Sequence, residues 1–286
     1  MGMQRATALT ILLAFSVALV GDVQALESGQ LPPTRLLSIG DSLTRGANAN
    51  LPGDNINNSW VNGYYGWEQR LFGLPNVNSH NQRITAQFGS SGRRNWIAAQ
   101  DGARVKDMAA QAAATASLGA SYATVLLGGN DVCRNSVAEL PTNAEFAGHV
   151  RNGLSTLLGG LPDGATVLVV AIPNVKALYD LGKAKTALGI TNCPSLWRLT
   201  GFCQAMLSPY RTEADRLYVQ SRNVGYNRIL QQVSQEMAAS HPGKFVRFAA
   251  AGYQLPSAQE HISDLDCFHA SWRGQRKLSA LTWPGF

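Results

Sequence analysis

Short apolar runs alternate along this chain with longer segments of helical periodicity. Five runs have the length of a strand and are apolar on both faces for most of their length, as in strands covered by helices on two sides. They lie at residues 35–40, 96–100, 123–128, 166–173 and 244–249. Apolar residues at helical spacing predict helices over 103–118, 143–161, 221–240 and 271–283. This alternation predicts right-handed crossovers and a mostly parallel α/β sheet.

Two connections are too long to be simple turns. Residues 47–66 are rich in Asn and aromatic residues, and residues 187–211 contain two cysteines and several large apolar side chains. Loops of this length in a compact domain usually have a function. The ligand site of a parallel sheet lies beyond the C-terminal ends of its strands. We therefore expect both connections to border a site, with a decorative surface insertion as the alternative.

The N-terminus has the three parts of a signal peptide. Arg5 precedes a continuous apolar run over 6–21, and Val23-Gln24-Ala25 fits the small-x-small cleavage pattern. We predict a signal peptide over 1–25, cleaved near Ala25, and a single domain over 26–286 that is secreted or periplasmic. An uncleaved anchor is the alternative, although the run of 16 residues is shorter than the ~20 that a spanning helix needs.

The composition fits a loop-rich α/β protein. Of the 286 residues, 45% are hydrophobic, 15% are charged and 28 are glycine. The formal net charge is +6, but no basic stripe with interleaved aromatic residues is present, which argues against nucleic-acid binding.

The cysteine count predicts two disulfides. The four cysteines are Cys133, Cys193, Cys203 and Cys267, an even number in an exported chain, and three pairings are open. A local bridge between Cys193 and Cys203 is the simplest choice, which leaves Cys133 with Cys267. The spacings contain no C-x-x-C pair or close Cys/His cluster, so we expect no metal site.

Ser42 follows the first predicted strand in the stretch RLLSIGDSLTRG. It would project from the edge of the sheet where ligands bind. The alternative is a capped helix start, in which this serine has no chemical role. A serine hydroxyl is a poor nucleophile unless a base takes its proton.

His269 is the best candidate for that base among five histidines. Asp266 precedes it by three residues in DLDCFHAS, and side chains at this spacing share one side of a turn. The carboxylate can then accept the Nδ1 proton and leave Nε2 for a serine. His261 and Asp264 are weaker alternatives. FGSSG at 88–92 is one residue short of the G-x-S-x-G motif, and we interpret it as a loop.

Two further segments could supply donors to a developing oxyanion. Asn130 lies in GGND after the strand predicted at 123–128, and its amide can donate. Gly102 follows the second strand and is expected to open the helix predicted over 103–118, where the helix dipole favours negative charge. The backbone N–H of Ser42 would be the third donor. For each segment, a tight turn is the alternative.

Four blocks together resemble the SGNH, or GDSL, hydrolase family. They are GDSL with Ser42, NWIAAQDGARVKDM with Gly102, GGND with Asn130, and DCFH with Asp266 and His269. The resemblance implies a flavodoxin-like three-layer α/β/α sandwich with a five-stranded, mostly parallel sheet. It also implies esterase or lipase activity without metal or organic cofactor. The nearest branch is that of phospholipase-B-like and extracellular lipases, although Ala270 stands where many relatives carry proline.

The expected function is that of a secreted serine esterase or lipase acting through an acyl-enzyme. The substrate would be an acylglycerol, a phospholipid or another acyl ester, with transient contact to a membrane or polysaccharide surface. The apolar residues of 187–211 suit an acyl chain: Trp197, Leu199, Phe202, Met206 and Leu207. The connection 47–66 suits a sugar, so a carbohydrate O-deacetylase is one alternative. A catalytically silent surface-binding module is another, and the oligomeric state is left open.

Overall fold

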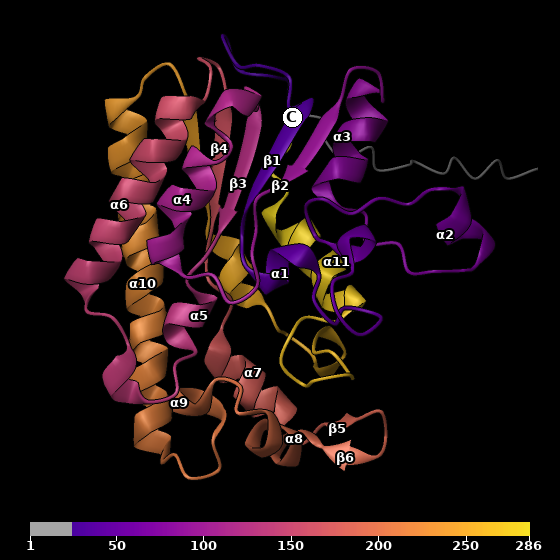
Figure 1. Cartoon of the computed structure of the whole chain (residues 1–286), viewed down its shortest axis with the longest axis vertical. Helices are drawn as coiled ribbons and strands as arrows, with labels where there is room; N and C mark the ends of the chain where they lie inside the picture. Colours follow the sequence, from indigo (N-terminus) through magenta and orange to yellow (C-terminus); the bar gives the residue numbers. More distant parts are fainter. Residues whose placement is uncertain (1–24) are drawn as a thin grey trace, which may run out of the picture.

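The computed structural model describes residues 25–286, so the predicted signal peptide lies outside the described residues except for Ala25. A five-stranded sheet with the order β2-β1-β3-β4-β7 forms its centre, and all neighbouring strands are parallel (Figure 1). The strands are β1 (Arg35–Gly40), β2 (Arg94–Ile97), β3 (Tyr122–Leu126), β4 (Thr166–Val170) and β7 (Phe245–Ala249). The predicted parallel α/β sheet is confirmed, with the strand order of a flavodoxin-like fold.

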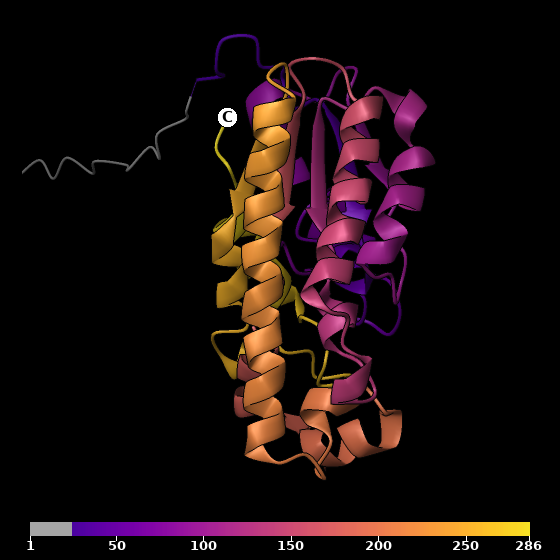
Figure 2. The ribbon, with the colours of Figure 1, turned by 90° about the vertical axis from the view of Figure 1, so that its left-hand side faces the viewer.

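Helices cover both faces of the sheet (Figures 1 and 2). On one face lie α4 (Met108–Ala113), α6 (Asn143–Gly160) and α10 (Glu213–Ser240), and on the other lie α3 (His80–Phe88) and α11 (Trp272–Thr282). Successive residues of a strand pack alternately against the two helix layers. Leu36 packs in the cluster of α3 and α11, and Leu37 packs in that of α4, α6 and α10. The three-layer sandwich is therefore confirmed.

Several predicted helices differ from the observed ones. The helix predicted at 221–240 begins eight residues earlier, at Glu213, because Thr212 and Asp215 form a capping box before it. The segment 103–118 is one short α-helix, α4, flanked by 3-10 turns at Val105–Asp107 and Ala116–Leu118. No helix within residues 25–286 has the length and apolarity needed to cross a membrane.

The connection predicted as a loop at 187–211 is mostly structured. After α7 (Val175–Gly182) the chain forms a hairpin of β5 (Thr186–Ala187) and β6 (Thr191–Asn192), then α8 (Cys193–Thr200) and α9 (Gln204–Leu207). These elements lie together beyond the C-terminal edge of the sheet, at the bottom of Figure 1. Three short helices complete that end and the side of the molecule: α1 (Ser42–Arg45), α2 (Trp67–Leu71) and α5 (Gly129–Val132).

The two disulfides join Cys133 to Cys203 and Cys193 to Cys267. The expected pairing of Cys193 with Cys203, and of Cys133 with Cys267, is therefore wrong. Cys193 is the first residue of helix α8, and the eight residues of this helix, at 1.5 Å each, carry the chain about 12 Å away before it reaches Cys203. That is too far for a bridge, which needs Cα atoms about 4.4–6.8 Å apart. Cys193 and Cys203 instead each pair with a cysteine outside the insertion, Cys267 and Cys133.

Candidate active site

Ser42 lies where β1 turns into the short helix α1. The cap of that helix is Asp41, whose carboxylate accepts a hydrogen bond from the N–H of Leu43 at 2.9 Å. A Cβ at Gly40 would lie 2.2 Å from Oγ1 of Thr44, so this sharp turn requires a glycine. The alternative in which Ser42 caps the helix is therefore wrong, since Asp41 has that role and the serine hydroxyl is available for another partner.

That partner is His269, from a loop more than 200 residues later in the chain. Its Nε2 lies 2.9 Å from Oγ of Ser42, and its Nδ1 lies 2.5 Å from Oδ2 of Asp266. The side chains of His269 and Asp266 are only 13% and 8% exposed. The structure thus brings the predicted serine, histidine and aspartate into one hydrogen-bonded chain.

Asp266 is held as an acceptor by several donors. Its Oδ1 accepts the backbone N–H groups of Phe268 at 2.9 Å and His269 at 3.0 Å. Burial acts to raise the pKa of this carboxyl, but hydrogen bonds from His269, Asn48 and the Phe268 N–H outweigh it and hold the pKa below its usual value. The group is therefore ionised at neutral pH and suited to orienting an imidazole.

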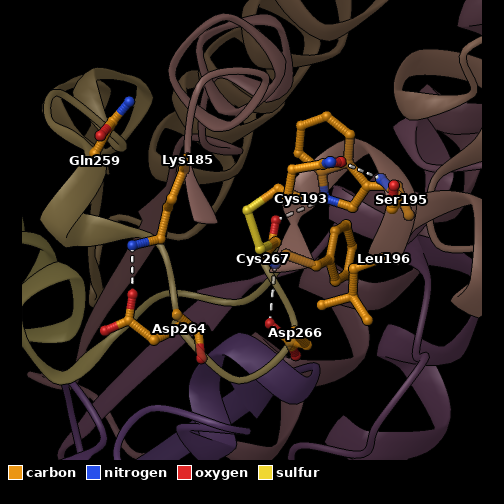
Figure 3. The surroundings of a disulfide bond; sticks show 12 residues. Lys185, Cys193, Ser195, Leu196, Gln259, Asp264, Asp266 and Cys267 are labelled. Atoms are coloured by element: carbon orange, nitrogen blue, oxygen red, sulfur yellow. Dashed lines mark hydrogen bonds and ion pairs between the residues drawn. A yellow bond between two sulfur atoms is a disulfide. The ribbon is translucent and has the colours of Figure 1, made fainter. Parts of the chain in front are cut away.

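The weaker alternatives do not join this chain of contacts. Asp264 is exposed and pairs with Lys185 instead (Figure 3). His261 accepts a hydrogen bond from the N–H of Ser257 at 3.2 Å, although it borders the same cleft as Ser42. FGSSG at 88–92 ends α3 and forms a turn, so its interpretation as a loop is confirmed.

The two predicted oxyanion donors line one cleft with Ser42. Asn130 lies on α5, and its Nδ2 donates to the carbonyl of Ala103 at 3.0 Å and faces Oδ2 of Asp41 at 3.4 Å. Gly102 has a φ of +73° and belongs to a turn. The expectation that it opens a helix is wrong.

The helical turn begins later than expected because two carboxylates take its first N–H groups. Asp107 accepts from the N–H of Arg104 at 2.9 Å, and Asp131 accepts from the N–H of Val105 at 3.0 Å. These contacts fix the start of the 3-10 turn at Val105 and leave Gly102 in the preceding turn.

Two clefts meet at Ser42, Asn130 and His269. One has mainly apolar walls from the end of β4, from α7 and from the segment before the loop of Asp266 and His269: Ile172, Pro173, Val175, Leu178, Leu255, Pro256 and Ile262. The other is more polar, with mixed walls from the 47–66 connection, the Gly102 turn, the segment after α5 and the end of α8: Asn48, Gly53, Asp54, Asp101, Asn135 and Phe202. The arrangement can hold a molecule with one apolar and one polar arm across the serine.

The expected acyl-chain residues of 187–211 do not line the apolar cleft. Trp197, Met206 and Leu207 are core residues that are at most 1% exposed, and Leu199 is 83% exposed at the surface. Only Phe202 borders the site, on the polar side, where its ring lies 5.1 Å from that of Phe268. The three buried residues, Trp197, Met206 and Leu207, instead pack the insertion into the core of the domain.

Both disulfides attach this insertion to the site. Cys267, between Asp266 and His269, bonds to Cys193 at the start of α8, and its carbonyl accepts the Nε1–H of Trp197 at 2.8 Å (Figure 3). Cys133, which ends the helix carrying Asn130, bonds to Cys203. One bridge thus holds the loop of Asp266 and His269, and the other holds the segment of Asn130.

Two further residues lie beside the hydrogen-bonded side chains of Ser42, His269 and Asp266 and were not identified from the sequence. Asp41 is buried beside Ser42, and burial raises the pKa of its carboxyl to about 7. Asn48 donates to Asp266 from the 47–66 connection. The only sequence signal was the high Asn content of that connection.

Among residues 25–286, no group of three or more His, Cys, Asp or Glu side chains is placed to hold a metal ion.

Several solved structures are similar to this chain. The TesA structure shares 17% identity over 88% of this chain and 97% of that one, with a TM-score of 0.46. The extracellular lipase from Streptomyces rimosus shares 16% identity over 88% of this chain and 100% of that one, also with a TM-score of 0.46. The Clostridium thermocellum family 3 carbohydrate esterase shares 14% identity over 86% of this chain and 92% of that one, with a TM-score of 0.44.

A comparison with curated proteins finds no match. The family model described as GDSL-like lipase/acylhydrolase matches residues 36–281, a range that begins within β1 and ends within α11. It therefore includes every strand of the central sheet and all the candidate site residues described above. On this match, the chain belongs to the GDSL-like lipase/acylhydrolase family and is a carboxylic ester hydrolase.

Proposed function

We propose that the protein is a secreted serine esterase or lipase in which Ser42, His269 and Asp266 form the catalytic triad. The contact that carries the proposal is the 2.9 Å distance from Nε2 of His269 to Oγ of Ser42. This distance is within the range that a general base needs to take a hydroxyl proton. The 2.5 Å contact on the other ring nitrogen would keep the proton on Nδ1 and leave Nε2 free to act.

The reaction follows from this geometry. As His269 takes the proton of Ser42, Oγ attacks the ester carbonyl and forms a tetrahedral intermediate. Asp266 stabilises the imidazolium, which then protonates the leaving alcohol, and an acyl-enzyme remains. A water molecule, activated by the same histidine, attacks the acyl group and restores the free serine.

The oxyanion would be stabilised by the backbone N–H groups of Ser42 and Gly102 and by the amide of Asn130. An amide nitrogen carries two hydrogens, so its bond to the Ala103 carbonyl leaves one for the substrate. The longer contact to Asp41, at 3.4 Å, is the one that would yield. Loss of one such donor typically lowers the rate by about 100- to 1000-fold.

We infer a lipid-like substrate from the two clefts. The apolar cleft would take the acyl chain, and the polar cleft would take a hydrophilic alcohol such as glycerol or a phosphorylated headgroup. Rates on p-nitrophenyl esters from acetate to palmitate, on a lysophospholipid and on acetylated xylan test this assignment. We expect rates to rise from acetate to medium acyl chains, whereas preference for acetylated xylan would favour a carbohydrate O-deacetylase, which the polar cleft also suits.

Secretion is supported by the oxidised state of all four cysteines, because disulfides persist in oxidising compartments. The mature protein would be a single domain of residues 26–286. Sequencing the N-terminus of the exported product should give Leu26 or a residue close to it, and an N-terminus at Met1 would contradict cleavage.

The triad is tested with Ser42→Ala, and Ser90→Ala is the matched control in the exposed turn of FGSSG. Turnover of p-nitrophenyl butyrate should be lost in Ser42→Ala by at least about 1000-fold, as expected when a triad nucleophile is removed. Ser90→Ala should retain it. Unchanged turnover in Ser42→Ala would contradict the proposed mechanism.

A further inference from the structure

A single carboxylate oxygen in the triad loop accepts two side-chain donors. Oδ2 of Asp266 lies 2.5 Å from Nδ1 of His269 and 2.6 Å from Nδ2 of Asn48. Asn48 comes from the connection that follows the nucleophile helix, six residues after Ser42 in the chain. The segment that carries the serine therefore also contacts the aspartate directly.

Asn48 is itself fixed on several sides. Its φ is +51°, a left-handed conformation that Asn tolerates better than most residues. Its backbone N–H donates to the carbonyl of Gly53 at 2.8 Å, and its Oδ1 accepts the N–H of Gly53 at 2.8 Å. Its own carbonyl accepts the hydroxyl of Ser263, at the start of the triad loop, at 2.6 Å. The amide is thus aimed at Asp266 from a rigid support.

We propose that Asn48 is a positioning residue for the reaction: its amide fixes the Asp266 carboxylate, which in turn aligns His269 with Ser42. A neutral donor is suited to this role, because it stabilises the carboxylate without competing for the proton that His269 transfers. The inference rests on the proposed triad. Consistent with it, the Asn48 bond is one of the contacts that hold the pKa of Asp266 below its usual value.

Asn48→Asp is the sharpest test, because it keeps the acceptor for the Gly53 N–H and replaces only the donor. At about pH 8 two ionised carboxylates would face each other, and the alignment of Asp266 would be lost. We expect kcat to fall about 10- to 100-fold, the size of one hydrogen bond to a charged group. At about pH 6 the pair would share one proton, and the deficit relative to wild type should shrink.

Asn48→Gly is the second variant; it keeps the left-handed backbone and the backbone N–H bond to the Gly53 carbonyl, and it removes the Oδ1 acceptor together with the amide donor. Without the amide, the Asp266 carboxylate loses a stabilising donor and takes up its proton at higher pH. The acid limb of the kcat profile should therefore move toward neutral pH, opposite to the change in Asn48→Asp. The effect should appear in kcat far more than in KM.

Asn55→Asp is the matched control in the same connection. Its side chain bonds to Leu51 and Gly53 and does not contact Asp266. We expect a lower unfolding temperature with an unchanged pH profile. The proposal is overturned if both Asn48 variants keep the wild-type profile, or if Asn55→Asp shifts it as Asn48→Asp does. Activity remaining in Ser42→Ala would instead overturn the triad itself, so the two failures are distinguishable.

Discussion

Two buried ionisable side chains respond to pH in opposite ways. His80 is fully buried, with Nδ1 2.8 Å from the hydroxyl of Tyr122 and Nε2 3.1 Å from Oγ1 of Thr282, and burial lowers its pKa to about 3. Asp41, beside the serine, has its pKa raised by burial to about 7. Each group is held uncharged, so each gives the folding free energy a pH dependence.

For His80, the unfolded chain takes up a proton below about pH 6.5, whereas the native state stays neutral down to about pH 3. The native state therefore loses stability as the pH falls through this window, by at most about 1.4 kcal/mol per pH unit. His80→Gln removes this loss. Urea unfolding at several pH values should show the variant gaining stability relative to wild type on acidification, and parallel curves would refute the assignment.

For Asp41, the unfolded chain releases its proton above about pH 3.8, whereas the native state keeps it up to about pH 7. The native state therefore loses stability as the pH rises through this window. Asp41→Asn has no such loss, and its stability relative to wild type should increase from pH 4 to 7 in the same urea series. A difference that does not vary with pH would mean that Asp41 is ionised throughout.

Among the elements, α6 packs against Met108 of α4 at a glycine. A Cβ on Gly153 would lie 2.5 Å from Cγ and Sδ of the buried Met108 and 2.6 Å from its Cβ. Gly148 lies on the same helix with no atom within 4 Å of such a Cβ.

Gly153→Ala should therefore cost about 1–3 kcal/mol of unfolding free energy, the usual cost of overpacking. Gly148→Ala should add up to about 1 kcal/mol, because alanine favours the helix. Urea denaturation of the pair measures both changes, and changes of the same sign would contradict this packing.

The insertion of α8 and α9 depends on the two disulfides for its attachment to both halves of the site. Replacing Cys193 and Cys267 by alanine should cost about 2–5 kcal/mol of stability, as is typical for such bridges. Activity should fall as well, since Cys267 lies between Asp266 and His269. A non-reducing digest should yield the peptide pairs 133–203 and 193–267, and a peptide joining Cys193 to Cys203 would contradict the structure.

The elements differ in how far the sequence could predict them. The central strands are apolar on both faces, and β1 was predicted to the residue. The edge strand β2 is exposed at Arg94 and Asn95, so its apolar pattern is weak, and the predicted strand starts two residues and ends three residues too late. The helices of the insertion and the broken helix after Gly102 were missed because capping carboxylates and disulfides, rather than apolar periodicity, set their bounds.

For the whole molecule, topology explains why four distant motifs could be recognised as one site. The five strands of the central sheet are parallel, so their C-terminal ends share one edge, where Ser42, Gly102 and Asn130 each follow a strand. The partners of each disulfide and the Asn48 contact to Asp266 could not be predicted, because they depend on how loops fold over that edge. The same is true of the apolar cleft, whose walls come from α7 and the segment before His269.

In the proposed mechanism, His269 and Asp266 activate the hydroxyl of Ser42. Covalent labelling of that hydroxyl tests this most directly. The purified protein would be treated with a fluorophosphonate and digested, and its peptides would be analysed by mass spectrometry. We expect one phosphonyl group on the peptide containing Ser42, and much slower labelling in His269→Ala. Labelling at another serine, or none in protein that hydrolyses p-nitrophenyl butyrate, would contradict the proposed site.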